Sequence, residues 1–344
     1  MPSFADWPIW GNVALFCVAA AAVWMSGTRL SRYADAIAKR TGIGQAVLGV
    51  ILLGGITSLP EIAVTGTAAT GGNAQLAVNN LLGGFTAQVA VLALADAVIR
   101  KRALTAVVPD PIVLLQGALG IVLVSITVCG IVVGDVAVLG AGAWTWGILF
   151  VFLYAIRMVA KSGSHPAWQV VGEPPSEEIG AEQPEVDHSD RRLYMLTAGV
   201  AAVILAMGWL LSTTGEALAE QTGLGDSFFG AVFIAISTSL PEISTVIAAV
   251  RLGRYVMAVS DIFGTNLFDV AIIVVVDLLF PGGPVLAEVG SFSILAGILG
   301  ILVTAIYLAG LIERRDPAVA GVGLDTILVA GVYVGGVVLL YTLR

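Results

Sequence analysis

The hexapeptide Thr-Ser-Leu-Pro-Glu-Ile occurs twice in this chain, at residues 57–62 and 238–243, and each copy lies inside a long apolar stretch. A proline inside a helix removes a backbone hydrogen bond and kinks or breaks the helix. A glutamate at membrane depth costs roughly 2.5–3.5 kcal/mol on insertion scales, and such residues mark functional sites. Because both features occur together twice, the pattern predicts a duplicated membrane transporter with an ion site at a broken helix.

The composition of the chain requires a lipid environment. Hydrophobic residues make up 58% of the 344 residues, charged residues make up 12%, and the mean hydropathy is +0.97. A soluble domain of this length needs far more surface charge. The apolar stretches are about 20 residues long, which is the length of a membrane-spanning helix. Ten spans are predicted, at residues 10–27, 44–70, 75–98, 111–133, 137–160, 193–213, 225–250, 255–279, 289–312 and 323–343.

Residues 164–192 are rich in Glu and Pro and have the composition of a solvated connector. We interpret this segment as an acidic cytoplasmic linker, with a regulatory role as the alternative. It contributes much of the net charge of −8, so that charge says little about partners and argues against nucleic acid.

Basic residues lie on one side of the predicted membrane. With the N-terminus outside, every Lys and Arg except Arg344 falls in an inner loop. These inner residues are Arg29, Arg32, Lys39, Arg40, Arg100, Lys101, Arg102, Arg157, Lys161, Arg191, Arg192, Arg251, Arg254, Arg314 and Arg315. The distribution predicts an integral protein of the plasma (inner) membrane, with its N- and C-termini outside.

The second half of the chain repeats the first well beyond the hexapeptide. Residues 35–98 align without a gap with 216–279, and the same shift lays 12–163 over 193–344. Five spans is an odd number, so the two halves must enter the membrane from opposite sides, as in many secondary transporters. We predict an all-α polytopic membrane protein of ten transmembrane helices in two inverted-topology five-helix repeats. The repeats are residues 1–163 and 193–344, joined by 164–192.

The prolines of the hexapeptides are expected to expose backbone oxygens. Pro60 and Pro241 each free a carbonyl oxygen four residues back, at Ile56 and Ser237. A hard cation is a suitable partner for such oxygens at membrane depth. A purely structural kink, with Ser and Thr hydroxyls bonded back to the helix, is the alternative interpretation.

Glutamates favour the cation site over the structural kink. Thr57 and Glu61 are four residues apart and share a helix face, as Thr238 and Glu242 do. Two symmetry-related carboxylates at membrane depth carry twice the insertion penalty of one. We therefore interpret Glu61 and Glu242 as functional residues.

A polar stripe on the eighth predicted span supplies a second group of candidates. Asp261, Thr265 and Asp269 recur every four residues on an otherwise apolar helix. The corresponding residues of the third span are Asn80, Gly84 and Gln88. The stripe is thus acidic in one half and neutral in the other. Hydrogen bonding between helices is the alternative role for Asn80 and Gln88.

Both repeats resemble the sodium/calcium exchanger family of the cation/calcium antiporter superfamily. That family has G-T-S-L-P-E on one helix of each repeat and G-N-x-x-G-S-N-x-x-(N or D) on the next. This chain has I-T-S-L-P-E at 56–61, S-T-S-L-P-E at 237–242 and S-D-I-F-G-T-N-L-F-D at 260–269. The counterpart in the first repeat is N-N-L-L-G-G-F-T-A-Q at 79–88.

The resemblance implies secondary active antiport of Ca²⁺ against Na⁺ by alternating access, with no cofactor and no enzymatic activity. It also implies that the first and sixth helices slide past a core that holds the ions. The implied side-chain ligands are Thr57, Ser58, Glu61, Thr238, Ser239, Glu242, Thr265 and Asp269. Gly54 and Ala235 would offer backbone oxygens.

Four departures from the family pattern stand out. Gly84 replaces a ligand serine, Gln88 replaces an asparagine or aspartate, and Phe85 replaces an asparagine. Asp261 adds a carboxylate where asparagine is usual, and we expect it to line the inner access path. A hydrogen bond to a neighbouring helix is the alternative role for Asp261. Proton-coupled calcium exchange or sodium/proton exchange therefore stays open beside sodium/calcium exchange, because clustered carboxylates favour protonation.

The sequence gives weaker support to two other functions, an intramembrane aspartyl protease and a channel. Gly-Leu-Gly-Asp at 223–226 fits the short G-x-G-D signature of intramembrane aspartyl proteases, which need two facing aspartates. A channel would use similar carboxylates, but paired broken helices favour alternating access. The expected partners are inorganic cations and the lipid bilayer, not nucleic acid, and the expected assembly is a monomer.

Overall fold

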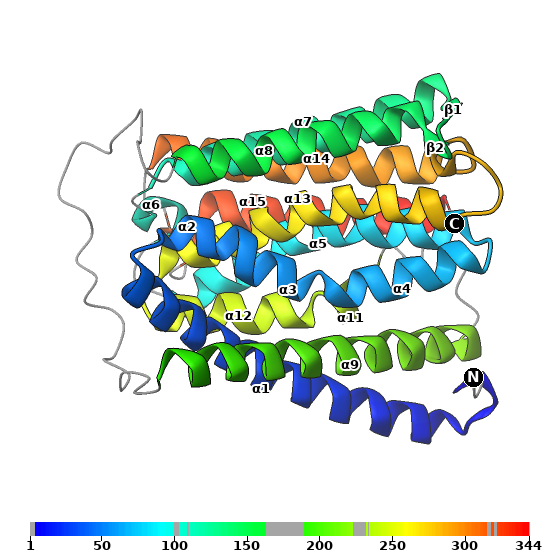
Figure 1. The fold of residues 1–344 in the computed structure, drawn as a ribbon. Coiled ribbons are helices and arrows are strands. Elements are labelled where there is room, and N and C mark those ends of the chain that lie inside the picture. The colour runs from blue at the N-terminus through cyan, green and yellow to red at the C-terminus, as the bar shows by residue number, and fades with distance from the viewer. Residues whose placement is uncertain are drawn as a thin grey trace.

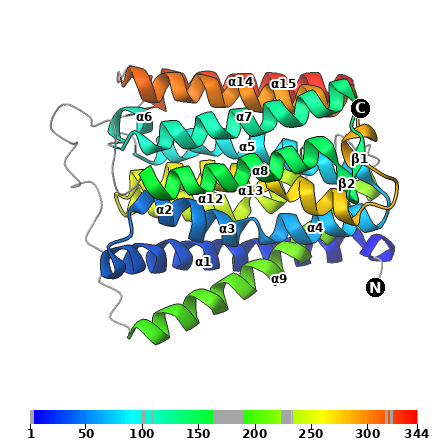
Figure 2. The ribbon, with the colours of Figure 1, turned by 45° about the horizontal axis from the view of Figure 1, so that its top comes forward.

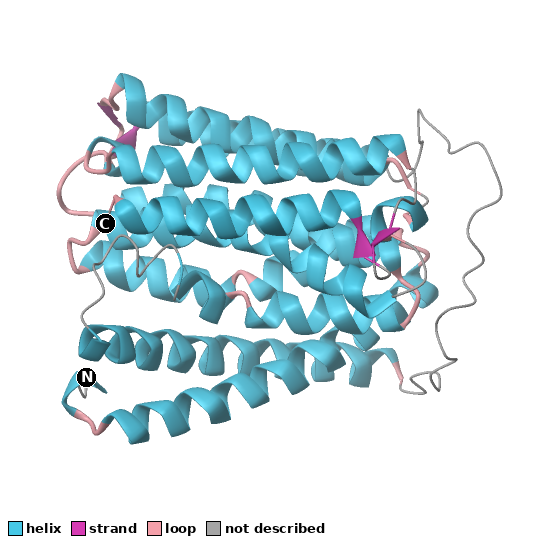
Figure 3. Cartoon of the chain, turned by 180° about the vertical axis from the view of Figure 1, so that it is seen from behind, coloured by secondary structure: helices cyan, strands magenta, loops and turns pink. Residues whose placement is uncertain are grey.

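Helices that run along one common direction make up nearly all of the described chain (Figure 1, Figure 3). The computed structural model describes residues 4–99, 103–108, 110–162, 189–222, 232, 234–314, 318–319 and 322–343. Within these ranges, eight helices are long and apolar enough to cross a membrane, or nine if a bent pair is one span. The prediction of an all-α polytopic membrane protein is thus confirmed. Most of the 164–192 linker and the 223–226 motif lie outside the described residues.

The described elements of the two halves follow a similar order. The first half contains η1 (Phe4–Asp6), α1 (Ile9–Thr41), α2 (Gln45–Leu48), the π-helical η2 (Gly49–Gly54), α3 (Gly55–Thr57), α4 (Leu59–Thr70), α5 (Ala74–Ile99), α6 (Leu104–Val107), α7 (Ile112–Val133), β1 (Ala137–Val138), β2 (Ala141–Gly142) and α8 (Ala143–Ser162). The second half contains α9 (Asp190–Thr222), α11 (Ala235–Thr238), α12 (Leu240–Arg251), α13 (Tyr255–Leu279), η4 (Val285–Ala287), α14 (Ser291–Glu313), β3 (Ala318–Val319), β4 (Val322–Gly323) and α15 (Leu324–Thr342).

The helix breaks lie where the repeated hexapeptide predicts them. The helices Gln45–Thr57 and Leu59–Thr70 meet at Ser58 with a bend of 42°. Pro60 stands in the first turn of α4, where its missing N–H removes no helical hydrogen bond. Pro241 occupies the same position in α12, after the break at Ser239. Each glutamate of the hexapeptide therefore lies in the first turn of a new helix.

Several predicted boundaries are wrong. The helix that contains the first predicted span, 10–27, continues to Thr41. Its last part carries Arg and Lys residues and lies beyond the apolar stretch. Gly42, with a φ of 70°, ends this helix, and Lys39 and Arg40 favour its C-terminus. The sixth span, predicted at 193–213, is the longer α9. The fifth, predicted from 137, begins with the β1–β2 hairpin and becomes helical only at Ala143.

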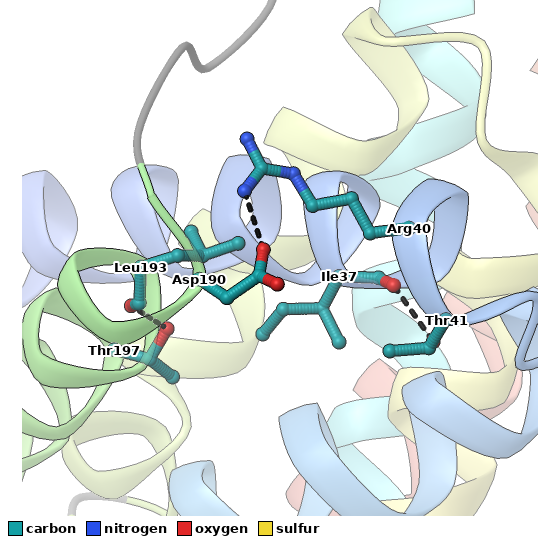
Figure 4. A network of polar contacts seen from close by, with 6 residues as sticks. All are labelled: Ile37, Arg40, Thr41, Asp190, Leu193 and Thr197. Carbon is teal, nitrogen blue, oxygen red and sulfur yellow. Dashed lines mark hydrogen bonds and ion pairs between the residues drawn. The ribbon is translucent and has the colours of Figure 1, made fainter.

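Helices α1 and α9 form a pair at one edge of the bundle, beneath α11 and α12 in Figure 1, and Figure 2 shows the same pairing from another side. They are antiparallel, since Arg40 near the end of α1 pairs with Asp190 at the start of α9 at 2.8 Å (Figure 4). At the other end, the Gln221 side chain donates to the carbonyls of Ala5 and Trp7, both at 3.0 Å.

Helices α5 and α13 form the centre of the bundle, and both are largely buried. Helix η2 packs against α13 through glycines. A Cβ on Gly54 would lie 2.8 Å from the amide nitrogen of Thr265, and one on Gly264 would lie 2.5 Å from the Cα of Val50. Glycine is therefore needed at both positions for the two backbones to approach.

Two buried aspartates tie each half of the chain to the other. Asp96 of α5 accepts the N–H of Leu104 at 2.5 Å and the N–H of Gly323 at 2.7 Å. Asp277 of α13 accepts the equivalent pair, from Val285 at 2.6 Å and from Gly142 at 2.6 Å. Each hairpin is thus bonded to the central helix of the opposite half. We call these two residues the aspartate clamps.

Candidate functional site

The glutamates of both hexapeptides are buried and face a common region of the bundle. Glu61 is 1% exposed and Glu242 is 0% exposed. The Glu242 carboxyl group interacts electrostatically with those of Glu61, Asp269 and Asp261. The two helix breaks therefore bring together acids that are far apart in the sequence.

None of the four carboxylate oxygens of Glu61 and Glu242 has a hydrogen-bond partner. The hydroxyl of Thr238 comes close to Glu61, but it donates to the carbonyls of Ile234 at 3.1 Å and Ala235 at 3.2 Å. Buried polar atoms without partners are unfavourable, and their clustering marks a place that binds a ligand. For carboxylate oxygens, a cation or a proton would supply the missing partner.

Hydroxyl groups join the first helix break to α13. The Thr57 hydroxyl donates to the Leu53 carbonyl at 3.0 Å and lies 3.1 Å from the Thr265 hydroxyl. Ser58 donates to the Gly54 carbonyl at 2.9 Å, and its Oγ lies 3.4 Å from Oδ1 of Asp269. The hydrogen bonds from these hydroxyls to carbonyls of their own helix are the ones expected for a purely structural kink. However, the same hydroxyls also lie within 3.4 Å of side chains on α13.

Asp269 and Gln88, which occupy equivalent positions in the two halves, contact each other. The side-chain amide of Gln88 donates to Oδ2 of Asp269 at 2.9 Å. The amide oxygen of Gln88 is buried and without a partner. This hydrogen bond therefore joins the central helices of the two halves at the candidate site.

The backbone oxygens implied as ligands are already engaged. The Gly54 carbonyl accepts the Ser58 N–H at 3.1 Å as well as the Ser58 hydroxyl, and the Ala235 carbonyl accepts the Ser239 N–H at 3.0 Å. In contrast, the hydroxyl of Ser239 is buried and without a partner.

Within the described ranges, no three His, Cys, Asp or Glu side chains converge tightly enough to hold a metal by themselves. A cation between Glu61 and Glu242 therefore needs hydroxyl or carbonyl oxygens to complete its coordination.

Asp261 interacts electrostatically with Glu242, but its hydrogen-bond partner is outside the predicted ligand set. Its carboxylate accepts a hydrogen bond from Thr245 of α12, which is the contact between helices expected for its alternative role, and Thr245 is not among the residues predicted from the sequence. The signal was available, since Thr245 is one helical turn from Glu242 and the two residues share a face of the helix.

Two cavities of unequal size lie beside α4 and α12, the helices that follow the breaks. The larger, about 250 Å³, lies between α4, α5 and α9 and includes Thr67, Gly71 and Thr213 in its lining. The smaller, about 60 Å³, lies between α1 and α12 and is lined at the corresponding positions by Ala248, Leu252 and Arg32. These two cavities therefore lie beside corresponding residues of the two halves but differ in volume.

Comparison with known proteins places this architecture among membrane exchangers. A family model described as sodium/calcium exchanger protein matches residues 11–163 and 192–341. The putative antiporter CaxA of Alkalimonas amylolytica is 27% identical over 307 residues, which cover 87% of this chain and 90% of that protein. The inner membrane protein YrbG of Escherichia coli (strain K12) is 27% identical over 92% of this chain and 93% of its own length.

A solved structure of similar fold is that of the sodium-calcium exchanger NCX_Mj soaked with 2.5 mM Na⁺ and 0.1 mM Sr²⁺. The TM-score is 0.70 at 17% identity, and the match covers 96% of this chain and 99% of that one. Sodium/potassium/calcium exchanger 5 of Homo sapiens is 26% identical over a shorter region, 33% of this chain and 23% of that protein.

Proposed function

Because this chain belongs to the sodium/calcium exchanger family, whose members are membrane cation antiporters, we propose that it exchanges calcium for sodium by alternating access. One observation carries the proposal. Glu61 and Glu242 stand at two equivalent helix breaks, fully buried, electrostatically coupled and without hydrogen-bond partners for any carboxylate oxygen. Two such charges match a divalent cation.

The coordinating oxygens come from both helix breaks and from α13. Glu61 and Glu242 supply charge, Asp269 adds a third carboxylate, and Ser239 has an unpartnered hydroxyl. The remaining proposed ligands are Thr57, Ser58, Thr238 and Thr265, the carbonyls of Gly54 and Ala235, and Gln88. Hydroxyls that now bond back to the helix would exchange those bonds for bonds to the cation.

The proposed topology has ten spans in two inverted repeats, 1–163 and 193–344. Support comes from the repeated order of elements, from the antiparallel α1 and α9, and from the reciprocal aspartate clamps. The basic residues Lys39, Arg40 and Arg254 gather at one end, where Arg254 pairs with Asp35 at 2.5 Å. We place that end inside and both termini outside, in the plasma (inner) membrane.

Alternating access requires that the site open to one side at a time. In the proposed topology, the larger cavity opens on the outer side and the smaller one on the inner side. Helices α1 and α9 border these cavities and pack mainly on each other and on the two broken helices. Sliding of this pair along the core would enlarge one cavity as it closes the other, which is the family's expected motion.

Proton coupling is the second candidate. Gly84 has no hydroxyl to offer a sodium ion, and the carboxyl group of Glu242 interacts electrostatically with those of Glu61 and Asp269, so protons could take the place of sodium there. The deciding experiment is calcium uptake into proteoliposomes of the purified protein, first under an imposed sodium gradient and then under an imposed pH gradient. Uptake driven by sodium alone supports the first proposal, and uptake driven by pH alone supports the second. Uptake that needs neither gradient overturns both.

A further inference from the structure

A second polar cluster lies one helical turn from the candidate calcium site, and the proposed function does not use it. Asp261 of α13 and Thr245 of α12 are both 0% exposed, and the Thr245 hydroxyl contacts Oδ2 of Asp261. The same hydroxyl lies 3.0 Å from the main-chain carbonyl of Glu242. Oδ1 of Asp261 has no hydrogen-bond partner.

This cluster holds more acceptors than donors. The Thr245 hydroxyl has one hydrogen, yet two acceptors are within its reach, the Asp261 carboxylate and the Glu242 carbonyl. Oδ1 of Asp261 is a further acceptor that no donor reaches. A cation or a proton on the Asp261 carboxyl group would satisfy this excess of acceptors, and oxygen ligands of this kind suit a hard cation.

The cluster is distinct from Asp269, although Asp261 interacts electrostatically with Glu242. Asp261 and Asp269 are eight residues apart on α13, which is roughly 12 Å at 1.5 Å per residue, too far for both to coordinate one ion. Thr245 lies on the part of α12 that leads towards Arg251, so the cluster is displaced towards the basic end of the molecule.

The first half of the chain has no such cluster. The positions equivalent to Thr245 and Asp261 hold Val64 and Asn80, an apolar and a neutral side chain. Asn80 is buried, and both its amide nitrogen and its oxygen lack partners, so it brings donors as well as an acceptor. The excess of acceptors therefore belongs to the second half alone.

We propose that Asp261, Thr245 and the Glu242 carbonyl form a second cation site that binds a sodium ion during exchange. A single carboxylate balances a single positive charge, whereas a divalent ion there would leave an unbalanced charge in a buried environment. This inference rests on the proposed function, because it assigns one of the sodium ions that the exchange would require. Glu242 would contact both ions, because its backbone carbonyl would bind sodium and its side-chain carboxylate would bind calcium. Binding at one site would therefore affect binding at the other.

The test is a sodium titration of ⁴⁵Ca²⁺ efflux from proteoliposomes, together with isothermal titration of the purified protein with NaCl. Loss of a charged ligand should raise the half-activating sodium concentration at least about tenfold in Asp261→Asn and lower the Hill coefficient. Loss of a neutral hydroxyl should raise it about threefold in Thr245→Val. Thr245→Ser, which keeps the hydroxyl, should restore the wild-type value.

Thr65→Val is the matched control. Thr65 is equally buried and its hydroxyl bonds to the Glu61 carbonyl at 2.5 Å, as that of Thr245 does to Glu242, but no carboxylate contacts it. Sodium activation should not change in this variant. An effect equal to that of Thr245→Val would overturn the inference, as would unchanged sodium activation in both Asp261→Asn and Thr245→Val.

The two proposals fail in different ways. Wild-type protein that exchanges no calcium overturns the proposed function. Wild-type protein that exchanges calcium with a sodium dependence that Asp261→Asn leaves intact overturns only the second site. If Asp261→Asn does not fold, the contrast between Thr245→Val and Thr245→Ser decides.

Discussion

The two halves of this molecule have the same residues at positions that hold the fold together, but different residues at positions in the candidate cation site. Asp96 and Asp277 make the same reciprocal hydrogen bonds, and both hairpins have the same register. At the candidate site, however, the positions that hold Gly84 and Gln88 in the first half hold Thr265 and Asp269 in the second. The two halves therefore share these structural contacts, while the additional acidic residues of the candidate site belong to the second half.

This difference teaches that symmetric architecture does not require a symmetric site. Both halves keep a buried glutamate at the helix break, so the central carboxylate pair is shared equally. Asp261 and Asp269 lie only on the second half, and their counterparts Asn80 and Gln88 are neutral. In the proposed site, a cation between Glu61 and Glu242 would contact both halves, whereas Asp261 and Asp269 would add charge from the second half alone.

The largest expected effect tests the symmetric part of the site. Glu61→Gln and Glu242→Gln should each reduce calcium exchange at least about 100-fold, because removing one charge from a buried ion site is worth several kcal/mol. Folded protein should still reach the membrane, since each substitution preserves size. The assay is ⁴⁵Ca²⁺ uptake into proteoliposomes, with exposed Glu288→Gln as the control. Near-normal exchange by either variant contradicts the site assignment.

The next effect tests the asymmetric part. Asp269→Asn should weaken calcium binding by about 10- to 100-fold, as expected for loss of a charged ligand. Gln88→Leu removes only the neutral partner of Asp269, and we expect it to weaken binding less than tenfold. Isothermal titration of the detergent-solubilised variants with CaCl₂ measures both. Equal losses in the two variants would mean that the halves contribute alike and that the acid at 269 has no special role.

Substitutions at the aspartate clamps test the stability of the fold independently of the candidate ion site. Asp96→Asn should lower the free energy of unfolding by about 3 kcal/mol, because hydrogen bonds to charged groups contribute about 1.5–3 kcal/mol. Asp277→Asn should have a smaller effect, since Asp96 also accepts the Thr326 hydroxyl at 2.6 Å. Thermal melting in detergent ranks the two. A larger loss in Asp277→Asn would show that the Thr326 contact adds nothing.

The smallest expected effect is on sodium activation, from a substitution that gives the first half a hydroxyl at the position equivalent to Thr265. A Cβ on Gly84 would lie 3.6 Å from Oδ2 of Asp269 and 3.8 Å from the Gln88 amide nitrogen, which is ordinary contact, so Gly84→Ser fits. The added hydroxyl should lower the half-activating sodium concentration about two- to fivefold, as expected for one neutral ligand. Gly84→Ala, which adds the carbon without the oxygen, is the control. Identical sodium activation in both variants would show that this position does not contact an ion.

Much of the fold could be read from the sequence because membranes impose strict rules. Apolar length predicts spans, and Pro60 and Pro241 mark helix breaks because proline cannot donate a backbone hydrogen bond. The boundaries of α1 and α9 were less predictable, since charged residues extend a helix beyond the apolar window as readily as they end it. The β1–β2 hairpin was missed because its residues are apolar and resemble the start of a span.

The sequence by itself determined the duplication, the placement of Glu61 and Glu242 at helix breaks, and the contrast between the halves, because these are properties of residue type and spacing. Tertiary structure alone decided the partners. The Gln88–Asp269 bond, the clamps from Asp96 to Gly323 and from Asp277 to Gly142, and the Thr245–Asp261 contact all join different helices or strands. Hydrogen bonding acts over about 3 Å, and only the packed backbones bring such groups within that distance.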